Sequence, residues 1–316
     1  MSLRPEITND RNLAMDLVRV TEAAALAASR WMGRGKKNEA DGAAVEGMRR
    51  AFDSVEIDGT VVIGEGEMDE APMLYIGEKV GAGGPPMDIA VDPLEGTTIT
   101  AKGGPNALAV VALAEQGNFL HAPDIYMDKI AVGGGLPDGV VDLDAPPGEN
   151  LRNLARAKKK DIGVCVLDRP RHAEIIAALR KAGCRVYLIT DGDVAGVINC
   201  TKPETGIDRY VGQGGAPEGV LAAAALKCVG GQFQGRLVFR NDDERARAER
   251  TGVTDFKRRY ALNELVSKDA IFLATGVTHG SLLSGVRVRD GVAETHTLVL
   301  NSSTRTASEL KVKQPA

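Results

Sequence analysis

The sequence has little of what marks several common classes of protein. Aromatic residues make up 4% of its 316 residues, and no long run of lysine and arginine occurs. With 39 basic and 43 acidic residues the formal net charge is −4. A mildly acidic chain with few aromatic side chains is not expected to bind nucleic acid or a membrane surface. These shortages indicate a protein that handles a small molecule.

Cysteine and long apolar runs are equally scarce. The four cysteines contain no CxxC pair, which argues against a zinc ribbon or a redox pair, and their apolar surroundings predict buried thiols at Cys165, Cys184, Cys200 and Cys228. No apolar run approaches the roughly 20 residues of a membrane span. The first residues, Met1–Glu6, lack the apolar segment of a signal peptide. We therefore expect a cytoplasmic protein.

Helix-like and strand-like segments alternate in the first half of the chain. Apolar residues recur at helical spacing from Leu13 to Ala24, after a possible cap at Asn9-Asp10, and a second helix is predicted from Asp41 to Phe52. Short apolar or β-branched runs predict strands at Thr60–Ile63, at Met87–Val91, where Asp92-Pro93 follows as a stop, and at Ala107–Ala112.

The second half alternates more regularly. It predicts strands at Ile162–Leu167, Arg185–Ile189, Tyr210-Val211 and Ala270–Ala274, helices at Ala173–Lys181, Val194–Ile198 and Glu218–Val229, and a hairpin turn at Arg289-Asp290-Gly291. The fold class predicted is α/β, in the sense of an α+β fold of alternating α and β layers with two subdomains. The glycine- and proline-rich stretch Gly133–Gly148 is the candidate hinge. We expect an N-terminal metal-binding domain over 1–158 and a C-terminal α/β domain over 159–316.

Carboxylates cluster where apolar strands end. Glu65 and Glu67 follow the strand Thr60–Ile63, and Asp92 and Glu95 follow Met87–Val91. Ligands bind beyond the carboxyl ends of strands in open α/β sheets, so these acids are expected to converge. Several acids that meet repel one another and need a cation, and oxygen donors without His or Cys favour Mg²⁺ or Mn²⁺. The alternative is that Asp92 only begins a turn and that the glutamates line a solvated loop.

The hexapeptide Asp92-Pro93-Leu94-Glu95-Gly96-Thr97 resembles the Asp-Pro-x-(Asp/Glu)-Gly-Thr signature of lithium-sensitive sugar and inositol phosphatases. The wider match is closer to the class II fructose-1,6-bisphosphatases of the GlpX family, and it runs in order from about Leu13 to about Arg305. Its motifs include Gly33-Arg34-Gly35, Ala40–Val45, Val62–Glu67, Asp69–Tyr75, Ala122-Pro123-Asp124, Asp191–Ala195 and Gly214–Gly219.

This resemblance implies the layered fold and hydrolysis of the 1-phosphate of fructose 1,6-bisphosphate with two or more Mn²⁺ or Mg²⁺ ions. It implies metal ligands at Asp41, Glu65, Asp92, Glu95 and Glu218, and catalytic roles for Lys37, Asp41 and Thr97. The substrate contacts it implies are Glu95, Gly96, Thr97, Tyr126, Arg169, Pro170, Arg171, Asp191, Gly192, Asp193 and Gly215. The C-terminal domain would thus supply most substrate contacts and one metal ligand, Glu218. We also expect a homo-oligomer, a dimer or a tetramer.

The chain departs from the family's pattern at two places. The family often has Lys where this chain has Arg169, which keeps the charge and changes the donor geometry. The segment Gly81–Pro86 is compact beside members with a longer loop, some of which also accept sedoheptulose 1,7-bisphosphate. Activity on that second substrate is left open.

Simpler interpretations exist for single residues. Taken alone, Asp41 is better explained as a helix cap, whereas inside the matched motif a metal ligand is favoured, and Glu218 is also explained as an acid at a helix N-terminus. Arg169 and Arg171 are explained as solvated loop residues, although two guanidinium groups beside a rigid proline suit a second phosphate. One alternative is an inositol or nucleotide monophosphatase, which needs no second phosphate site. Another is a non-catalytic sugar-phosphate sensor, which would have lost a metal-binding acid. Because this chain has both the arginines that suit a second phosphate and all the matched acids, the bisphosphatase is favoured.

Overall fold

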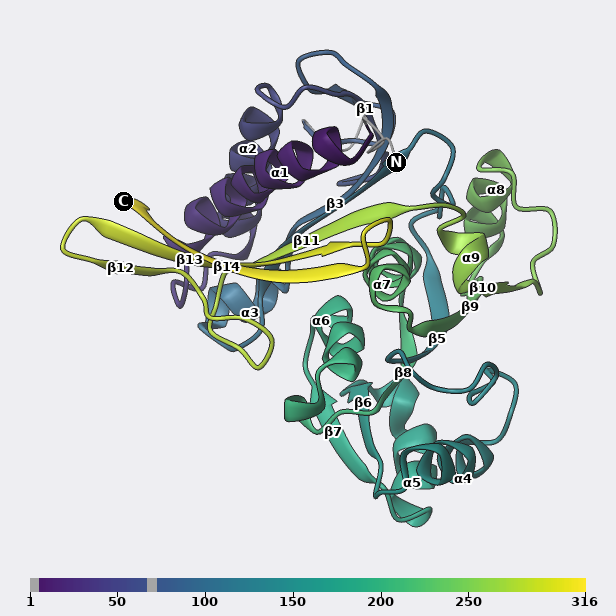
Figure 1. Cartoon of the computed structure of the whole chain (residues 1–316). Coiled ribbons are helices and arrows are strands. Elements are labelled where there is room, and N and C mark those ends of the chain that lie inside the picture. Colours follow the sequence, from purple (N-terminus) through teal and green to yellow (C-terminus); the bar gives the residue numbers. More distant parts are fainter. Residues whose placement is uncertain (1–5, 67–72) are drawn as a thin grey trace, which may run out of the picture. The chain divides into compact units, whose positions relative to one another are not determined.

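The computed structural model describes residues 6–66 and 73–316, with side chains from residue 13 onward. The chain forms two compact units: unit 1 is Met1–Asn118 with Asp269–Ala316, and unit 2 is Phe119–Lys268. Each unit contains a mixed β-sheet with helices packed on it (Figure 1). This architecture confirms the predicted α+β layered class.

The first unit is discontinuous in sequence, and its limits differ from the division expected at residue 158. The last four strands, β11 (Ala270–Gly276), β12 (Arg287–Arg289), β13 (Val292–Asn301) and β14 (Thr306–Pro315), all belong to the sheet of unit 1. Strand β11 pairs along its whole length with β4 (Leu108–Glu115). The loose stretch Gly133–Gly148 therefore connects elements within unit 2.

The sheet of unit 1 has the strand order β12-β13-β11-β4-β3-β1-β2, and β14 pairs with β13. Its remaining strands are β1 (Asp58–Ile63), β2 (Lys79–Val80) and β3 (Pro86–Glu95). Helices α1 (Glu6–Ser29) and α2 (Lys37–Phe52) pack against it, and Leu17, Met48, Phe52, Ile89 and Leu273 are among the buried residues of the shared core. A short helix, α3 (Thr97–Lys102), follows β3.

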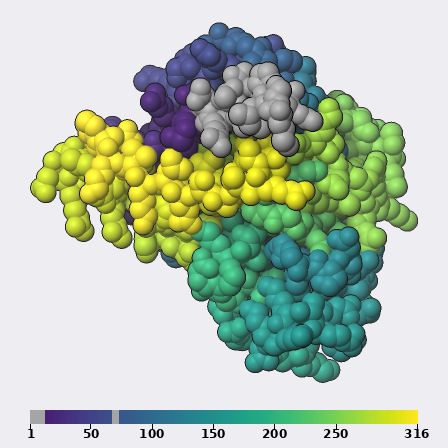
Figure 2. Space-filling model, in the orientation of Figure 1, coloured from purple at the N-terminus to yellow at the C-terminus, as the bar shows by residue number. Residues whose placement is uncertain are grey.

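Strand β14 lies at the surface of unit 1, as the yellow segment of Figure 2 shows. Its side chains are exposed or half-buried along its whole length, and they include Glu309, Lys311 and Lys313. Charged side chains on an edge strand discourage pairing with a further strand.

Unit 2 contains a six-stranded sheet in the order β10-β9-β5-β8-β6-β7. The strands are β5 (Tyr126–Val132), β6 (Gly163–Leu167), β7 (Arg185–Ile189), β8 (Arg209–Gly215), β9 (Gln232–Val238) and β10 (Arg259–Ala261). The helices α4 (Pro147–Lys158) and α5 (Ala173–Lys181) pack on one face through Leu154, Ile176 and Leu179. Helices α6 (Asp193–Ile198) and α7 (Ala216–Val229) contact each other and β8, and α7 also contacts β5. Helix α8 (Asp242–Arg250) follows β9, and α9 (Leu262–Leu265) contacts β9 and β10 (Figure 1).

Local patterns located many of these elements, and several boundaries were wrong, among them those of α1, α2 and β3. Helix α1 begins at Glu6, before the expected cap at Asn9-Asp10. Helix α2 begins at Lys37 with Lys36 as its N-cap residue, so Asp41 lies inside the helix and is not a cap. Strand β3 does not stop at Asp92-Pro93, because it continues to Glu95. The hairpin turn is confirmed, with Asp290 and Gly291 at φ 51° and 75°, the left-handed values that a type I′ turn needs.

Candidate functional site

The predicted acids of unit 1 share one edge of its sheet. Strands β1 and β3 are parallel neighbours, with Thr60 paired to Asp88 and Ile63 to Ala90. Their carboxyl ends therefore lie side by side. Glu65 comes two residues after β1, and Asp92 and Glu95 lie at the end of β3. Glu67 lies outside the described residues, as does most of the motif Asp69–Tyr75.

An irregularity in β3 positions Asp92 and Glu95. The register against β4 shifts between these two residues, so Asp92 pairs with Val110 and Glu95 with Leu108. Such a bulge redirects side chains at the end of a strand and is common beside active sites. The Asp92 Oδ1 atom accepts a hydrogen bond of 3.2 Å from the Leu94 amide, and Glu95 is buried. The bulge keeps both acids on the strand that the Asp-Pro sequence was expected to end.

The residues after Glu95 turn sharply into α3. Gly96 adopts the left-handed conformation with φ 90°, and Thr97 is the first residue of the helix. A side chain at position 96 would be strained in this conformation and would crowd Ile99. The strand, the bulge and this turn therefore carry Asp92, Glu95 and Thr97 along one continuous segment.

Lys37 and Asp41 lie one turn apart on α2 and share a face of the helix. Partial burial raises the pKa of Asp41, and the positive charge of Lys37 lowers it. Helix α2 packs against both β3 and α3. The helix thus places a partly buried carboxylate with a nearby ammonium group against the elements that carry Asp92 and Thr97.

Unit 2 contains a buried polar cluster at the end of β8. The Lys129 Nζ atom lies 2.6 Å from Asp193 Oδ2, and the two side chains are 1% and 8% exposed. The Tyr210 hydroxyl donates to the same Asp193 oxygen at 3.4 Å. Glu218, on α7, has a shielded Oε2 atom without a hydrogen-bond partner among the described residues. Burial raises the pKa of Glu218, Lys129 lowers it, and Asp193 raises it.

Two glycines allow the carboxylates of this cluster to lie against the backbone. A Cβ atom on Gly214 would lie 2.1 Å from Asp193 Oδ2, and one on Gly215 would lie 1.9 Å from Glu218 Oε2. Real Cβ atoms do not approach so closely, so both positions require glycine while the acids stay where they are. The position of Asp193 therefore depends on Gly214, and that of Glu218 depends on Gly215.

Lys129 is the member of this cluster that sequence reasoning missed. It lies on β5 between Asp128 and the apolar segment Ile130-Ala131-Val132. A charged side chain that a strand buries beside apolar residues rarely lacks a partner. That rule could have marked Lys129 as the partner of a buried acid.

One predicted arginine, Arg171, lies against Tyr126 together with a second arginine, Arg240. The guanidinium carbon of Arg171 lies 4.8 Å from the centre of the Tyr126 ring, and that of Arg240 lies 4.6 Å from it. Arg171 also donates to the Gln213 carbonyl at 2.7 Å, which anchors it beside β8. Arg240, which the motifs did not indicate, is held by an ion pair with Glu244 at 2.5 Å. Two cations on one tyrosine suit a bound anion.

Other predicted substrate residues lie at the ends of elements in unit 2. Arg169 is a half-buried N-cap residue before Pro170, and its guanidinium donates to the Asp168 carbonyl at 3.2 Å. Gly192, with φ 82°, leads directly into α6 at Asp193. Asp191 precedes this turn. The structure thus brings Asp193, Gly215 and Glu218 together, brings Arg171 and Tyr126 together, and shows no direct contact of Arg169 with either group among the described residues.

The residues of the two clusters fit a divalent cation in their chemistry. The donors are carboxylate oxygens, without His or Cys, and this set suits Mg²⁺ or Mn²⁺. The Glu218 Oε2 atom is a buried acceptor that no described residue satisfies. In the described part of the chain, no three His, Cys, Asp or Glu side chains already stand in metal-binding geometry.

Comparison with known proteins identifies the family. Residues 11–314 match the family model for bacterial, glpX-encoded fructose-1,6-bisphosphatase. The chain is 47% identical over 318 residues to fructose-1,6-bisphosphatase 1 class 2 of Escherichia coli K12, with 95% of this chain and 94% of that protein covered. The class 2 enzyme of Shigella flexneri gives the same identity and coverage. No helix in the described residues is long and apolar enough to cross a membrane. The chain belongs to the glpX-encoded family of bacterial fructose-1,6-bisphosphatases.

Proposed function

We propose that this protein hydrolyses the 1-phosphate of fructose 1,6-bisphosphate to give fructose 6-phosphate and phosphate. The observation that carries the proposal is the match to this family from residue 11 to residue 314. The convergence of Glu65, Asp92 and Glu95 at one edge of the unit 1 sheet supports it. The sequence analysis predicted metal-binding carboxylates at the ends of these same strands.

Membership of this family implies dependence on a divalent metal, and Mn²⁺ or Mg²⁺, as two or more ions, is our finer proposal. Asp41, Glu65, Asp92 and Glu95 of unit 1 would hold the metal, with Glu218 as the ligand from unit 2. When bound, divalent ions activate water and stabilise the leaving oxygen of a phosphate ester. Lys37 would balance the charge of the phosphoryl oxygens, and the Thr97 hydroxyl would orient the attacking water.

The remaining predicted residues would bind the substrate. Arg171 and Arg169 would hold the far phosphate, and Pro170 would fix their spacing. Tyr126, which lies against Arg171, would support that arginine. Asp191 and Asp193 would accept hydrogen bonds from sugar hydroxyls, with Gly192, Gly215 and Gly96 allowing the backbone to approach. A firm hold on the far phosphate positions the near one for attack.

A phosphate-release assay tests this function and its alternatives together. The substrates are fructose 1,6-bisphosphate, sedoheptulose 1,7-bisphosphate, fructose 6-phosphate, inositol 1-phosphate and a nucleoside monophosphate, each with Mg²⁺ and with Mn²⁺. We expect the highest kcat/KM on fructose 1,6-bisphosphate, and none without a divalent ion. Faster turnover of inositol 1-phosphate would make the protein a monophosphatase. Absence of turnover on every substrate, with binding retained, would make it a sugar-phosphate sensor.

Two further expectations accompany this proposal. Turnover of sedoheptulose 1,7-bisphosphate in the same assay decides whether the compact segment Gly81–Pro86 narrows the substrate range. A homo-oligomer, dimer or tetramer, is proposed, and light scattering coupled to size-exclusion chromatography measures its mass against the 33.3 kDa of one chain.

A further inference from the structure

Two consecutive residues, Arg171 and His172, bind both backbone groups of Gln213 on β8. Arg171 donates to the Gln213 carbonyl from Nε at 3.3 Å and from Nη2 at 2.7 Å. The Gln213 amide in turn donates to the Nε2 atom of His172 at 2.8 Å. The described pairs of β6 with β8 end at Cys165 and Tyr210, so Gln213 lies beyond the part of β8 that β6 covers. Side chains from one turn therefore bind β8 where this strand neighbour is missing.

The hydrogen bonds of His172 determine which ring nitrogen carries the proton. The side chain is 4% exposed, and its Nδ1 atom lies 2.7 Å from the Leu167 carbonyl oxygen. Because the Gln213 amide is a donor, Nε2 must accept, and it can accept only in the neutral ring. Nδ1 then carries the proton and donates it to the Leu167 carbonyl. The geometry therefore requires a neutral imidazole with its proton on Nδ1.

The surroundings of His172 include charges of both signs. Burial lowers the pKa of the imidazole most, and the hydrogen bond to the Leu167 carbonyl raises it. The charges of Arg171 and Arg169, on the same turn, lower this pKa, and that of Asp128, on β5, raises it. The net direction is downward, which favours the neutral ring that the Gln213 amide needs.

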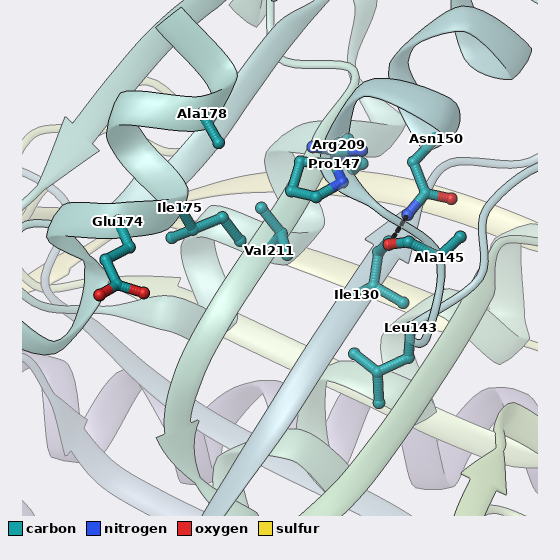
Figure 3. Close-up of a pocket in the computed structure, with 10 residues that line it drawn as sticks. All are labelled: Ile130, Leu143, Ala145, Pro147, Asn150, Glu174, Ile175, Ala178, Arg209 and Val211. Atoms are coloured by element: carbon teal, nitrogen blue, oxygen red, sulfur yellow. Dashed lines mark hydrogen bonds between the residues drawn. The ribbon is translucent and has the colours of Figure 1, made fainter. Parts of the chain in front are cut away.

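Packing of α5, which begins directly after His172, contributes little to holding this turn on β8. A cavity of about 390 Å³ lies between the helix and the sheet, with Ile175 and Ala178 of α5 and Val211 of β8 in its lining (Figure 3). Side chains of α5 and β8 thus leave part of the space between them unfilled. Gly212 instead gives the imidazole room, because a Cβ atom there would lie 3.3 Å from its Nε2 atom. The attachment therefore depends on the hydrogen bonds to Gln213.

We propose that His172, neutral and with its proton on Nδ1, is a positioning residue that holds Arg171 in place for the far phosphate of the bisphosphate substrate. Its role rests on the proposed function, in which Arg171 binds that phosphate. The imidazole joins the end of β6, through the Leu167 carbonyl, to Gln213 on β8, and Arg171 is bound to the same residue of β8.

A second proton on the ring would break this arrangement. The Nε2–H group of a charged His172 and the Gln213 N–H are both donors, so they cannot bond to each other. The turn would then lose its attachment through His172, and the position of Arg171 would become less defined. The tight hold on the far phosphate is therefore present above the pKa of His172 and is lost as the pH falls through that pKa.

Nitrogen NMR of the histidine-labelled protein tests the state of this ring without any substrate. The chain has four histidines, few enough for each signal to be assigned by substitution. His296 is the buried control, because the Ser284 amide donates to its Nδ1 atom at 3.0 Å and its proton must lie on Nε2. We expect the opposite tautomer for His172, and a ring that is still mostly neutral at pH 6.5, the usual pKa of a histidine. A proton on Nε2 of His172, or a mostly charged ring at that pH, would overturn the proposal.

A double-mutant cycle tests whether His172 acts through Arg171. His172→Gln loses the bridge between Leu167 and Gln213, and we expect the KM for fructose 1,6-bisphosphate to rise about five- to tenfold, with a smaller change in kcat. The KM for fructose 1-phosphate, which lacks the far phosphate, should stay almost unchanged. In the Arg171→Ala background the same substitution should add little, because the group that it positions is gone. Exposed His279→Gln is the control and should behave like the wild type. Additive losses, or equal losses on both substrates, would contradict the role of His172.

The pH dependence of the wild type decides the question even if His172→Gln does not fold. The ratio of the KM for fructose 1,6-bisphosphate to that for fructose 1-phosphate should rise as the pH falls through the pKa that NMR gives for His172. The far phosphate itself titrates near about pH 6, so Arg171→Ala supplies the baseline. The same pH profile in both enzymes would remove His172 from substrate binding and leave the proposed hydrolysis standing. Absence of bisphosphate turnover by the wild type would instead refute the hydrolysis itself, whatever the NMR shows.

Discussion

Lys129 and Asp193 form a buried ion pair, with Nζ and Oδ2 2.6 Å apart and both side chains almost inaccessible to water. The lysine comes from the middle of β5 and the aspartate from the first position of α6, so the pair joins an inner strand to the helix that covers it. The charge of Lys129 also lowers the pKa of Glu218, while that of Asp193 raises it. The pair therefore links the stability of unit 2 to the acid that is predicted to bind metal.

Replacing Lys129 should destabilise the protein strongly. Lys129→Met leaves Asp193 charged and buried without its cation, and breaking a buried pair in this way costs about 3–5 kcal/mol. Lys79→Met, which breaks the exposed pair with Asp58, is the control and should cost less than about 1 kcal/mol. Urea unfolding followed by circular dichroism measures both. Similar midpoints for the two variants would show that the buried pair contributes no more to stability than the exposed pair.

A methyl group at position 215 should displace Glu218. Gly215 has φ −62°, so alanine fits the backbone, yet its Cβ would lie 1.9 Å from Glu218 Oε2. We expect Gly215→Ala to lower kcat/KM by about tenfold or more, equivalent to roughly 1.4 kcal/mol, while the fold is kept. Gly148→Ala, where the nearest atom is Arg152 Nη1 at 3.6 Å, is the matched control. Equal activity of both variants would contradict the role of Glu218.

The acids at the end of β3 should be needed for metal binding. Asp92→Asn and Glu95→Gln keep the shape of each side chain and remove the charge that holds a divalent cation. We expect each to lose most activity at saturating metal and to weaken Mn²⁺ binding measured by electron paramagnetic resonance, with unchanged thermal unfolding of the metal-free protein. Glu56→Gln, at an exposed position, should behave as wild type. Normal turnover in either β3 variant would remove that acid from the metal assignment.

Arg171 should distinguish a bisphosphate from a monophosphate. A charge-assisted hydrogen bond contributes about 1.5–3 kcal/mol, so Arg171→Ala should raise the KM for fructose 1,6-bisphosphate by about one to two decades and affect a monophosphate far less. Arg180→Ala, at the exposed end of α5, serves as the control. Steady-state kinetics on both substrates measures the difference. Equal losses on both would assign Arg171 to the reacting phosphate or to its contact with the Gln213 carbonyl.

The stability of unit 1 should depend on pH through Glu22. Burial raises the pKa of Glu22 from about 4.5, against the effects of the hydrogen bond from Thr295 and of Arg19, which lower it. The folded state therefore binds the proton more tightly than the unfolded chain, and stability is lost as the pH rises through the raised pKa. Glu22→Gln should gain stability over the wild type at pH 7 and less at pH 4. Thermal unfolding across this pH range measures the difference in stability between Glu22→Gln and the wild type, with the exposed variant Glu46→Gln as control. A difference that stays constant from pH 4 to pH 7 would contradict the role of Glu22.

Local sequence patterns were sufficient for most elements and for the acids of unit 1. The strands Thr60–Ile63 and Met87–Val91 and the turn at Asp290-Gly291 depend on alternation and on backbone preferences of adjacent residues, which the chain carries locally. The convergence of Glu65 with Asp92 needed one further rule, that parallel neighbours end at the same edge. The family resemblance then supplied the roles of individual residues, which remain predictions.

Tertiary structure alone decided the remaining features. The return of β11 to the sheet of unit 1 pairs residues more than 150 positions apart, and no local pattern specifies a distant strand partner. The continuation of β3 past Pro93 depends on β4, which supplies the neighbour that the bulge needs. Lys129 and Arg209 look like ordinary basic residues in the sequence. Only the packing around them removes water from both, giving Lys129 an acid and leaving the Arg209 guanidinium without a hydrogen-bond partner among the described residues, because burial is a property of the neighbours that the fold brings together.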